Sequence, residues 1–232
     1  MSVSLKPPYI RKIDERGNLQ IWLVDGSYIR NHIDVGFTNY GQHYSCSYIP
    51  LNELWIDFEA KSHEQRFYIY HLLTEYRLMA EGVSYYDAVK KADLVERRER
   101  RRGGDLSRLT HRGQTLPDGR DVHERLWKKT ENGVSVWIVN GRLVRSVFDI
   151  DFADGGHDHV YEYVPENEVW IDDDLQEKER GYILLHELHE RNLMAKGSPY
   201  EKAHNEANRL EYRCRHHPDG LHDALAAEGW AY

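Results

Sequence analysis

The stretch Tyr163-Val-Pro-Glu-Asn-Glu-Val-Trp-Ile-Asp172 decides the fold, because the chain contains it twice. Its earlier copy is Tyr48-Ile-Pro-Leu-Asn-Glu-Leu-Trp-Ile-Asp57, in which seven of the ten positions are identical. Working outward, residues 22–96 align with residues 137–211 without a gap, and 26 of these 75 positions are identical. The period of 115 residues indicates a duplicated domain and not a solenoid, whose units are about 20–50 residues long. The sequence therefore predicts two homologous repeats.

The chain has 232 residues, of which 40% are hydrophobic and 30% charged, as expected for two globular domains of common size. We assign residues 1–101 to the first repeat and residues 126–232 to the second repeat with a C-terminal tail. Residues 102–125 are polar and rich in turn-forming residues, so we interpret them as a linker.

A net charge of −8 argues against nucleic acid as the main partner, since phosphate binding requires a basic face. The local exception is the arginine-rich run Arg97–Arg102. Cations are favourable near the C-terminus of a helix, so we interpret this run chiefly as a solvated helix end. Contact with nucleic acid or an acidic partner remains the alternative.

The chain offers no apolar run of about 20 residues and no signal-peptide core, so we expect no membrane partner. Its two cysteines, Cys46 and Cys214, occupy non-equivalent positions of the repeats and form no disulfide framework. A reducing cytoplasm is the expected location.

Each repeat begins with an Asp-Gly or Asn-Gly pair between two apolar stretches, a pattern that predicts a β-hairpin. The hairpin strands are expected at residues 19–24 and 28–33, and at residues 134–139 and 143–148. In the second repeat we expect further extended segments at residues 149–152, 160–164 and 168–172. Because the connections are too short for crossover helices, we predict a small antiparallel sheet in each repeat.

Two helices follow each sheet. The first helix of the second repeat is expected from about Gln176 to Met194, with Gly197 as its C-terminal glycine. The next helix begins after Ser198, which can form a capping box with Glu201, and runs toward Arg215. The tail contains one short helical pattern at residues 221–228. The fold class is therefore α+β, with each repeat a small antiparallel sheet followed by a helical hairpin.

The segment most suited to chemistry is Leu184-Leu-His-Glu-Leu-His-Glu190. On a helix, positions i and i+4 share a face, which places His186 beside Glu190. His204 on the following helix is the expected third ligand of one divalent metal. Two histidines, one carboxylate and a water form a standard catalytic zinc arrangement. Glu187 lies where a general base for that water is needed.

His186-Glu187 on a helix that follows an edge strand, residues 168–172, resembles the zincin metallopeptidases, especially their minimal forms. The resemblance covers about residues 165–211. It implies a zinc-dependent hydrolase of peptide or amide bonds. The zincin motif has histidine where this chain has Glu190, giving His-Glu-x-x-Glu. A carboxylate also ligates zinc, and manganese or iron remain alternatives because carboxylate-richer sites accept harder ions.

Comparison of the repeats supports this choice of residues. His186 and Glu190 have counterparts in His71 and Glu75, whereas three polar residues of the second repeat are replaced in the first. These pairs are Glu187 and Leu72, His189 and Thr74, and His204 and Val89. We interpret the first repeat as a degenerate partner that forms an intramolecular pseudo-dimer with a working second repeat. The opposing interpretation is that the shared His–Glu pair is structural.

Further residues of the second repeat are candidates to bind substrate or to support a metal ligand: His189, Asp151, His157, His159 and Glu211. The function favoured by these patterns is metal-dependent hydrolysis of a peptide or other small substrate. The alternative is a non-catalytic structural or protein-interaction module built from a duplicated domain.

Overall fold

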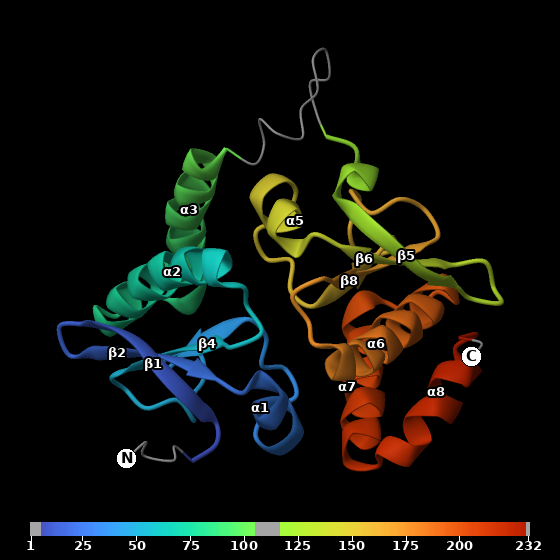
Figure 1. Ribbon diagram of the computed structural model, residues 1–232, viewed down its shortest axis with the longest axis horizontal. Helices are drawn as coiled ribbons and strands as arrows, with labels where there is room; N and C mark the ends of the chain where they lie inside the picture. Colours follow the sequence, from blue (N-terminus) through green and yellow to red (C-terminus); the bar gives the residue numbers. More distant parts are fainter. Residues whose placement is uncertain (1–5, 105–116, 231–232) are drawn as a thin grey trace. The chain divides into compact units, whose positions relative to one another are not determined.

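The computed structural model describes residues 6–104 and 117–230. The chain divides into two compact units, Met1–Asp105 and Leu106–Tyr232, each with a four-stranded sheet followed by helices (Figure 1). The first unit contains β1 (Tyr9–Arg16), β2 (Leu19–Val24), α1 (Gly26–His32), β3 (Tyr40–Gln42), β4 (Glu53–Asp57), α2 (Ser62–Ala80) and α3 (Tyr85–Gly103). The second contains η1 (Gly119–Val122), β5 (His123–Lys129), β6 (Ser135–Val139), α5 (Gly141–Val147), β7 (Gly155–His157), β8 (Glu168–Asp172), α6 (Glu177–Ala195), α7 (Tyr200–His216), η2 (Pro218–Gly220) and α8 (Leu221–Ala227). The predicted α+β class with two similar halves is confirmed.

The sheets are mixed, so the prediction of purely antiparallel sheets was wrong. The strand order is β1-β2-β4-β3 in the first unit and β5-β6-β8-β7 in the second. The two central strands of each sheet pair in parallel, with Trp22 opposite Trp55 and Trp137 opposite Trp170. The outer pairs are antiparallel. Parallel pairing requires a long crossover, and α1 or α5 lies within it.

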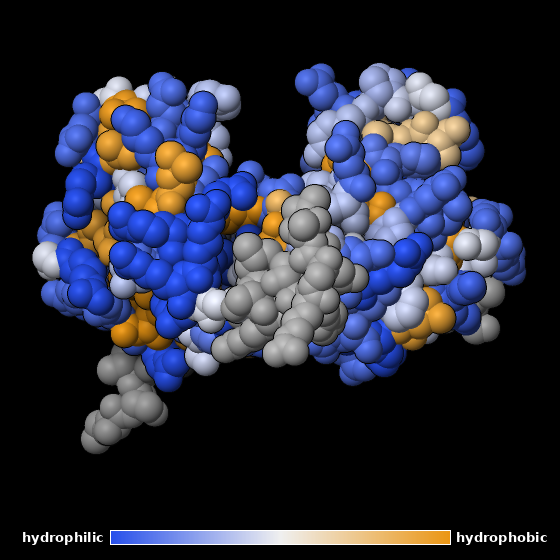
Figure 2. Space-filling model, turned by 90° about the horizontal axis from the view of Figure 1, so that it is seen from above, coloured by the Kyte–Doolittle hydropathy of each residue, from blue (hydrophilic) through white to orange (hydrophobic). Residues whose placement is uncertain are grey.

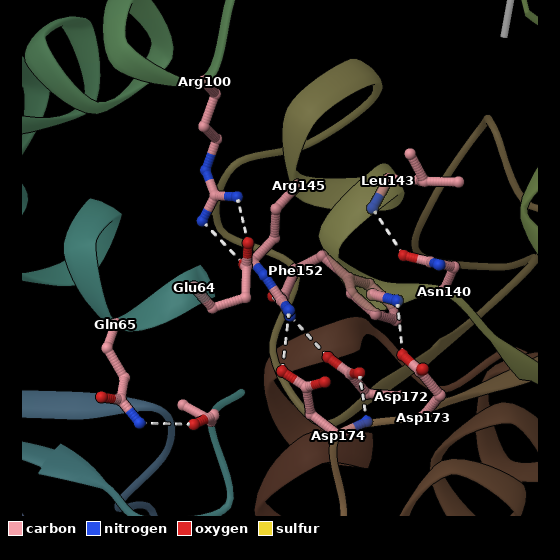
Figure 3. Close-up of polar contacts among 12 residues, drawn as sticks. Glu64, Gln65, Arg100, Asn140, Leu143, Arg145, Phe152, Asp172, Asp173 and Asp174 are labelled. Carbon is pink, nitrogen blue, oxygen red and sulfur yellow. Dashed lines mark hydrogen bonds and ion pairs between the residues drawn. The ribbon is translucent and has the colours of Figure 1, made fainter. Parts of the chain in front are cut away.

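The predicted hairpins at Asp25-Gly26 and Asn140-Gly141 were also wrong, because each pair begins a helix. Asp25 Oδ1 accepts a hydrogen bond from the Tyr28 backbone N–H at 2.9 Å. Asn140 Oδ1 accepts one from the Leu143 backbone N–H at 3.1 Å (Figure 3). Asp and Asn are preferred N-caps as well as turn residues, so the dipeptide alone does not distinguish a hairpin from a helix start.

A buried arginine joins each short helix to the end of the central strand. Arg30 Nη1 donates to Asp57 Oδ2 at 2.9 Å and to the Phe37 carbonyl oxygen at 3.3 Å. Arg145 makes the same contacts with Asp172 and the Phe152 carbonyl oxygen (Figure 3). The two aspartates therefore serve mainly as arginine partners.

The alternation of side chains along the strands divides each unit into two apolar layers. In the first unit, Ile21, Leu23 and Leu54 pack with Tyr68 and Leu72 of α2. On the opposite face, Ile29 of α1 packs in a second cluster with Val24, Phe37, Ile49 and Trp55. The second unit repeats this division, and its α6 layer also includes the C-terminal residues Leu225 and Trp230. The helical hairpin thus lies on one face of each sheet.

Several local predictions have different outcomes. The first helix of the second repeat and the C-terminal helical pattern are confirmed as α6 and α8. Residues 149–152 and 160–164 form turns and not strands. The expected Ser198 cap was wrong, because the N-cap of α7 is Pro199 and makes no side-chain hydrogen bond. Much of the predicted linker, residues 105–116, lies outside the described residues, while its ends belong to α3, η1 and β5.

Hydrophobic side chains on the face drawn in Figure 2 form separate patches among hydrophilic ones. This agrees with a mean hydropathy of −0.76. Within residues 6–104 and 117–230, no helix combines the length and apolar character needed to cross a membrane.

Candidate metal centre

The helical hairpin of the second repeat brings three candidate ligands together. His186 and Glu190 lie one turn apart on α6, as their spacing predicts. Gly197 follows α6 with a φ of 92°, a conformation that favours glycine, and the chain then enters α7. His204 lies near the start of α7. His186, Glu190 and His204 each offer a ligand atom, and these atoms lie within 4.8 Å of one another.

The three donor atoms form a compact triangle. Nε2 of His186 lies 3.2 Å from Nδ1 of His204 and 3.4 Å from Oε2 of Glu190. The same Glu190 oxygen lies 2.7 Å from Nδ1 of His204. Zinc bound tetrahedrally at 2.0–2.1 Å requires ligand atoms about 3.3 Å apart. An ion therefore fits this triangle after only a small separation of Glu190 and His204.

A buried carboxylate orients the first histidine. Oε2 of Glu211 lies 3.0 Å from Nδ1 of His186, on the opposite side of the ring from the triangle. Glu211 in turn accepts a hydrogen bond from Arg215 Nε at 2.8 Å, and Arg215 Nη1 donates to Glu179 at 2.9 Å. In the neutral ring that a metal ion would require, a proton held between His186 Nδ1 and Glu211 leaves the Nε2 lone pair facing the triangle. This carboxylate–histidine arrangement is the usual support of a metal-bound imidazole.

The sheet supplies a partner for the carboxylate ligand. His157 is fully buried at the end of β7, and its Nε2 lies 3.0 Å from Oε1 of Glu190. Since this contact uses one carboxylate oxygen, the other oxygen, Oε2, remains directed at the two histidines of the triangle. His157 therefore supports a ligand and lies outside the triangle itself.

Glu187 lies beside the same strand. A Cβ atom built on Gly155 would come within 3.0 Å of Glu187 Cγ and 3.1 Å of its Oε1. A larger residue at position 155 would therefore press against Glu187, and glycine leaves room for the carboxylate. The pKa of the Glu187 carboxyl is raised to about 8. Burial is the largest cause; the charge of His186 lowers the pKa and the charge of Glu190 raises it. A pKa near neutrality is suited to proton transfer.

His186 and Glu190 shift each other's pKa. Burial lowers the pKa of His186, but hydrogen bonds to Glu190 and Glu211 outweigh this effect and raise it to about 10. Burial raises the pKa of Glu190, and hydrogen bonds from His157, His186 and His204 outweigh it and hold the pKa well below its usual range. Without an ion, the charge of His186 and the three hydrogen bonds therefore stabilise the carboxylate. A divalent cation would take over this role.

The open side of the triangle lies at His204, whose side chain is 40% exposed, while those of His186 and Glu190 are 10% and 4% exposed. The ring of Tyr200 stacks on that of His204 at a centroid distance of 5.4 Å. Burial, followed by the charge of Glu187, raises the pKa of nearby Tyr161. Neutral phenols and the Glu187 carboxyl thus lie near an accessible ligand.

Three other candidate residues make their contacts outside the triangle. Nδ1 of His189 lies 2.7 Å from Glu228 Oε1, so this histidine holds the C-terminal segment. The backbone N–H of His159 donates to Nδ1 of His157, and its ring is 6.1 Å from the His157 ring. Asp151 is exposed, and its backbone N–H donates to Asp149. Among the described residues, the three-ligand group includes none of these three.

Sequence reasoning missed Arg215, Glu179 and the role of Gly155. The first two have identical counterparts in Arg100 and Glu64, and an arginine kept in both repeats was the available signal. The three successive aspartates at 172–174 form a second group of close carboxylates. Arg145 pairs with the first and third of them, which accounts for their proximity.

No protein-family model, no curated protein and no solved structure matches this chain. The resemblance to zincins therefore stays a prediction based on His186 and Glu187. Its expected edge strand was wrong, because β8 lies between β6 and β7 in the sheet. A functional proposal therefore rests on the geometry of His186, Glu190 and His204 in the second repeat.

Proposed function

We propose that the second repeat binds one divalent metal ion through His186, Glu190 and His204 and is a metal-dependent hydrolase. The single observation that carries the proposal is the triangle of donor atoms with separations of 2.7, 3.2 and 3.4 Å. It is supported by partners that hold two of the three ligands, Glu211 behind His186 and His157 behind Glu190. Metal-binding histidines usually have such a partner.

The donor set favours zinc. Two imidazole nitrogens and one carboxylate oxygen form a common catalytic zinc set that leaves a fourth position for water or substrate. Manganese and iron accept the same donors, so elemental analysis must decide between them. A bound ion of this kind acts as a Lewis acid and makes water a stronger nucleophile near neutral pH.

Each residue then has a defined task. Glu187 accepts the proton of the attacking water and returns it to the leaving group, for a peptide or amide bond the amine nitrogen. Glu211 and Arg215 keep His186 in one tautomer and orientation. His157 holds Glu190. The peptide or amide substrate is inferred only from the resemblance of His186-Glu187 to the zincin motif.

The decisive experiment removes the ligand that the first repeat lacks. His204→Val copies the residue found at the equivalent position, Val89, so the substituted repeat keeps a combination that this fold already accommodates. In protein purified without chelator, we expect about one metal ion per chain for the wild type and almost none for His204→Val. Elemental analysis measures both values, and circular dichroism checks the fold.

His216→Val is the matched control, because His216 lies exposed near the end of the same helix, with Nδ1 2.8 Å from the Tyr212 carbonyl oxygen. It should keep the metal content of the wild type. Metal-free wild-type protein that also fails to take up added zinc, manganese or iron would overturn the proposal. So would equal metal content in wild type and His204→Val.

A non-catalytic structural module is the second candidate, and one observation favours it. The first repeat keeps the network without a third ligand: His71 Nδ1 lies 3.0 Å from Glu96 and His71 Nε2 lies 3.4 Å from Glu75. Most of the His–Glu network is therefore compatible with a purely structural role. Next to this network, Glu187, His204, His157 and Gly155 are among the residues that distinguish the second repeat, and the metal analysis tests the role of His204.

A further inference from the structure

Among the described residues, the first repeat has a groove on α2 where the equivalent face of α6 in the second repeat is buried. The groove has a volume of about 290 Å³ and is lined by one stripe of α2 together with the end of β1. The lining residues are Arg16, Arg66, Ile69, Tyr70, Leu73 and Arg77. Tyr70 is 46% exposed, and Ile69 and Leu73 are half-buried. Among the described residues, no helix covers this face of α2.

The same face of α6 is covered in the second repeat. Leu184, Leu185 and Leu188 occupy the positions of Ile69, Tyr70 and Leu73, and they are at most 1% exposed. They pack with the C-terminal segment, whose contributing side chains are Leu221, Ala224, Leu225 and Trp230. Figure 1 shows α8 beside α6. The fold therefore shows what kind of element seats on this surface: a short amphipathic helix.

Polar contacts fix the end of that helix. Glu228 accepts hydrogen bonds from Asn192 Nδ2 at 2.7 Å, and its other carboxylate oxygen lies 2.7 Å from His189 Nδ1. The positions of Asn192 and His189 in the first repeat are Arg77 and Thr74. In the second repeat the Asn192 amide contacts the Glu228 carboxylate of the covering segment. At the equivalent position, the groove of the first repeat has the Arg77 guanidinium.

Charge complementarity identifies the occupant. The groove has three arginines, of which Arg16 also pairs with Asp14 at 2.8 Å, and two, Arg66 and Arg77, lie exposed at its rim. The segment that covers α6, residues 218–230, contains Asp219, Asp223 and Glu228 and no lysine or arginine. We propose that the groove on α2 binds an acidic amphipathic helix of a partner protein, seated as α8 is seated on α6.

Apolar contacts and ion pairs would both stabilise such an interface. Leucine-type side chains of the partner would cover Ile69, Tyr70 and Leu73 and remove apolar surface from water. Tyrosine is a frequent anchor at interfaces because it buries a large ring at low entropic cost. Carboxylates of the partner would pair with the rim arginines and fix its direction. This is the helix-in-groove mode of recognition, and it does not depend on metal binding in the second repeat.

The chain provides a probe for the test. A fluorescently labelled peptide of residues 217–230 is acidic, apolar on one side and free of lysine and arginine. Titrated with the full chain, it should give saturable binding by fluorescence anisotropy, with a Kd below about 1 mM. Hydrogen exchange should show new protection in α2 and no change in α6. A peptide in which Asp223 and Glu228 are replaced by amides should bind more weakly.

Variants of the full chain locate the site. Arg66→Glu combined with Arg77→Glu should weaken binding about tenfold or more, because reversal of both charges replaces attraction of the acidic peptide by repulsion. Tyr70→Ala should also weaken it. The matched control is Arg98→Glu with Arg101→Glu, an equal charge change on exposed residues of α3, which should leave binding unchanged.

The proposal is overturned by absence of saturable binding, by binding insensitive to the groove variants, or by equal weakening in the α3 control. Self-association of the wild-type chain that disappears in Arg66→Glu/Arg77→Glu would assign the groove to a second copy instead. Protection of α6 in place of α2 would show that the peptide merely exchanges with α8, and would also overturn it.

Discussion

The two repeats share one buried network and differ in what lies around it. In the first repeat Arg100 joins Glu64 and Glu96, and Glu96 contacts His71. In the second, Arg215 joins Glu179 and Glu211, and Glu211 contacts His186 at the same 3.0 Å. The network therefore belongs to the fold.

The differences lie on one side of that network. Tyr40 of the first repeat contacts His71 with a ring distance of 5.0 Å, whereas its counterpart Gly155 leaves room for Glu187. Gln42, which donates to Glu75 at 2.8 Å, takes the place of His157. The third donor, His204, is replaced by Val89. A shared scaffold thus carries polar groups in one repeat and apolar or neutral groups in the other.

The largest expected effect comes from breaking the shared network. Arg100→Met and Arg215→Met each leave two buried carboxylates without their cation, which should cost about 3–5 kcal/mol in the repeat that is changed. Because the network is common to both repeats, the two losses should be similar. Hydrogen exchange analysed by peptide reports the opening free energy of each repeat separately.

Arg98→Met and Arg213→Met are the matched controls, since these arginines occupy equivalent exposed positions two residues earlier. They should change stability by no more than about 0.5 kcal/mol. Losses below about 1 kcal/mol for both buried arginines would show that the network is not what holds α2 to α3 and α6 to α7.

The next effect separates the proposed base from the proposed ligands. Glu187→Leu introduces the residue found at the equivalent position of the first repeat, Leu72. Metal content should be unchanged, while hydrolysis should fall by about 10²–10⁴-fold, the usual contribution of a general base. A quenched-fluorescent peptide library measures hydrolysis, and elemental analysis measures metal. Joint loss of metal and activity would instead make Glu187 a ligand.

A transfer experiment sharpens the comparison from the other side. Val89→His should add a third donor beside His71 and Glu75. In a chain that also carries His204→Val, it should restore metal binding, now in the first repeat. Affinity should be about 10- to 100-fold weaker than that of the native site, because Gln42 replaces His157 as the partner of the carboxylate. Isothermal titration with zinc measures it; no recovery would show that three donors on this scaffold do not suffice.

Much of the fold could be predicted from the sequence. The internal repeat, α6 and its C-terminal glycine, and the strand before it follow from patterns that act over a few residues. The parallel pairing of the central strands could not be predicted, because it depends on α1 and α5. Those helices were hidden by Asp25-Gly26 and Asn140-Gly141, which have the composition of a hairpin turn and the hydrogen bonds of a helix N-cap.

The candidate site divides in the same way. The spacing of His186 and Glu190 predicts a common helical face, and the antiparallel return of α7 places His204 beside them. His157 could be named as a candidate, but its contact with Glu190 depends on the register of β7 against β8. The contact of His189 with Glu228 could not be predicted, because the docking of the C-terminal segment onto α6 is a tertiary contact without a local signal.

The smallest effect concerns an ion pair found only in the second repeat. Arg191 donates to Asp158 through Nε at 2.6 Å and Nη2 at 2.9 Å, whereas the equivalent residues of the first repeat are Tyr76 and His43. Burial raises the pKa of Asp158, but hydrogen bonds from Arg191 and from the Asn167 backbone N–H outweigh it and hold the pKa below its usual value. A carboxyl with a lowered folded-state pKa stabilises the protein above its unfolded pKa, about 3.9 for aspartate.

Stabilisation by this pair should therefore be complete near neutral pH and be lost as the pH falls through the lowered folded-state value. Asp158→Asn should reduce the stability of the second repeat by about 1.5–3 kcal/mol at pH 7, the range for a hydrogen bond to a charged group. The difference from wild type should shrink below about pH 4. Asp118→Asn, a change at an exposed aspartate, is the control and should show a much smaller difference at either pH. A cost for Asp158→Asn that persists unchanged into acid would mean that the side chain stabilises the loop through its shape and not through its charge.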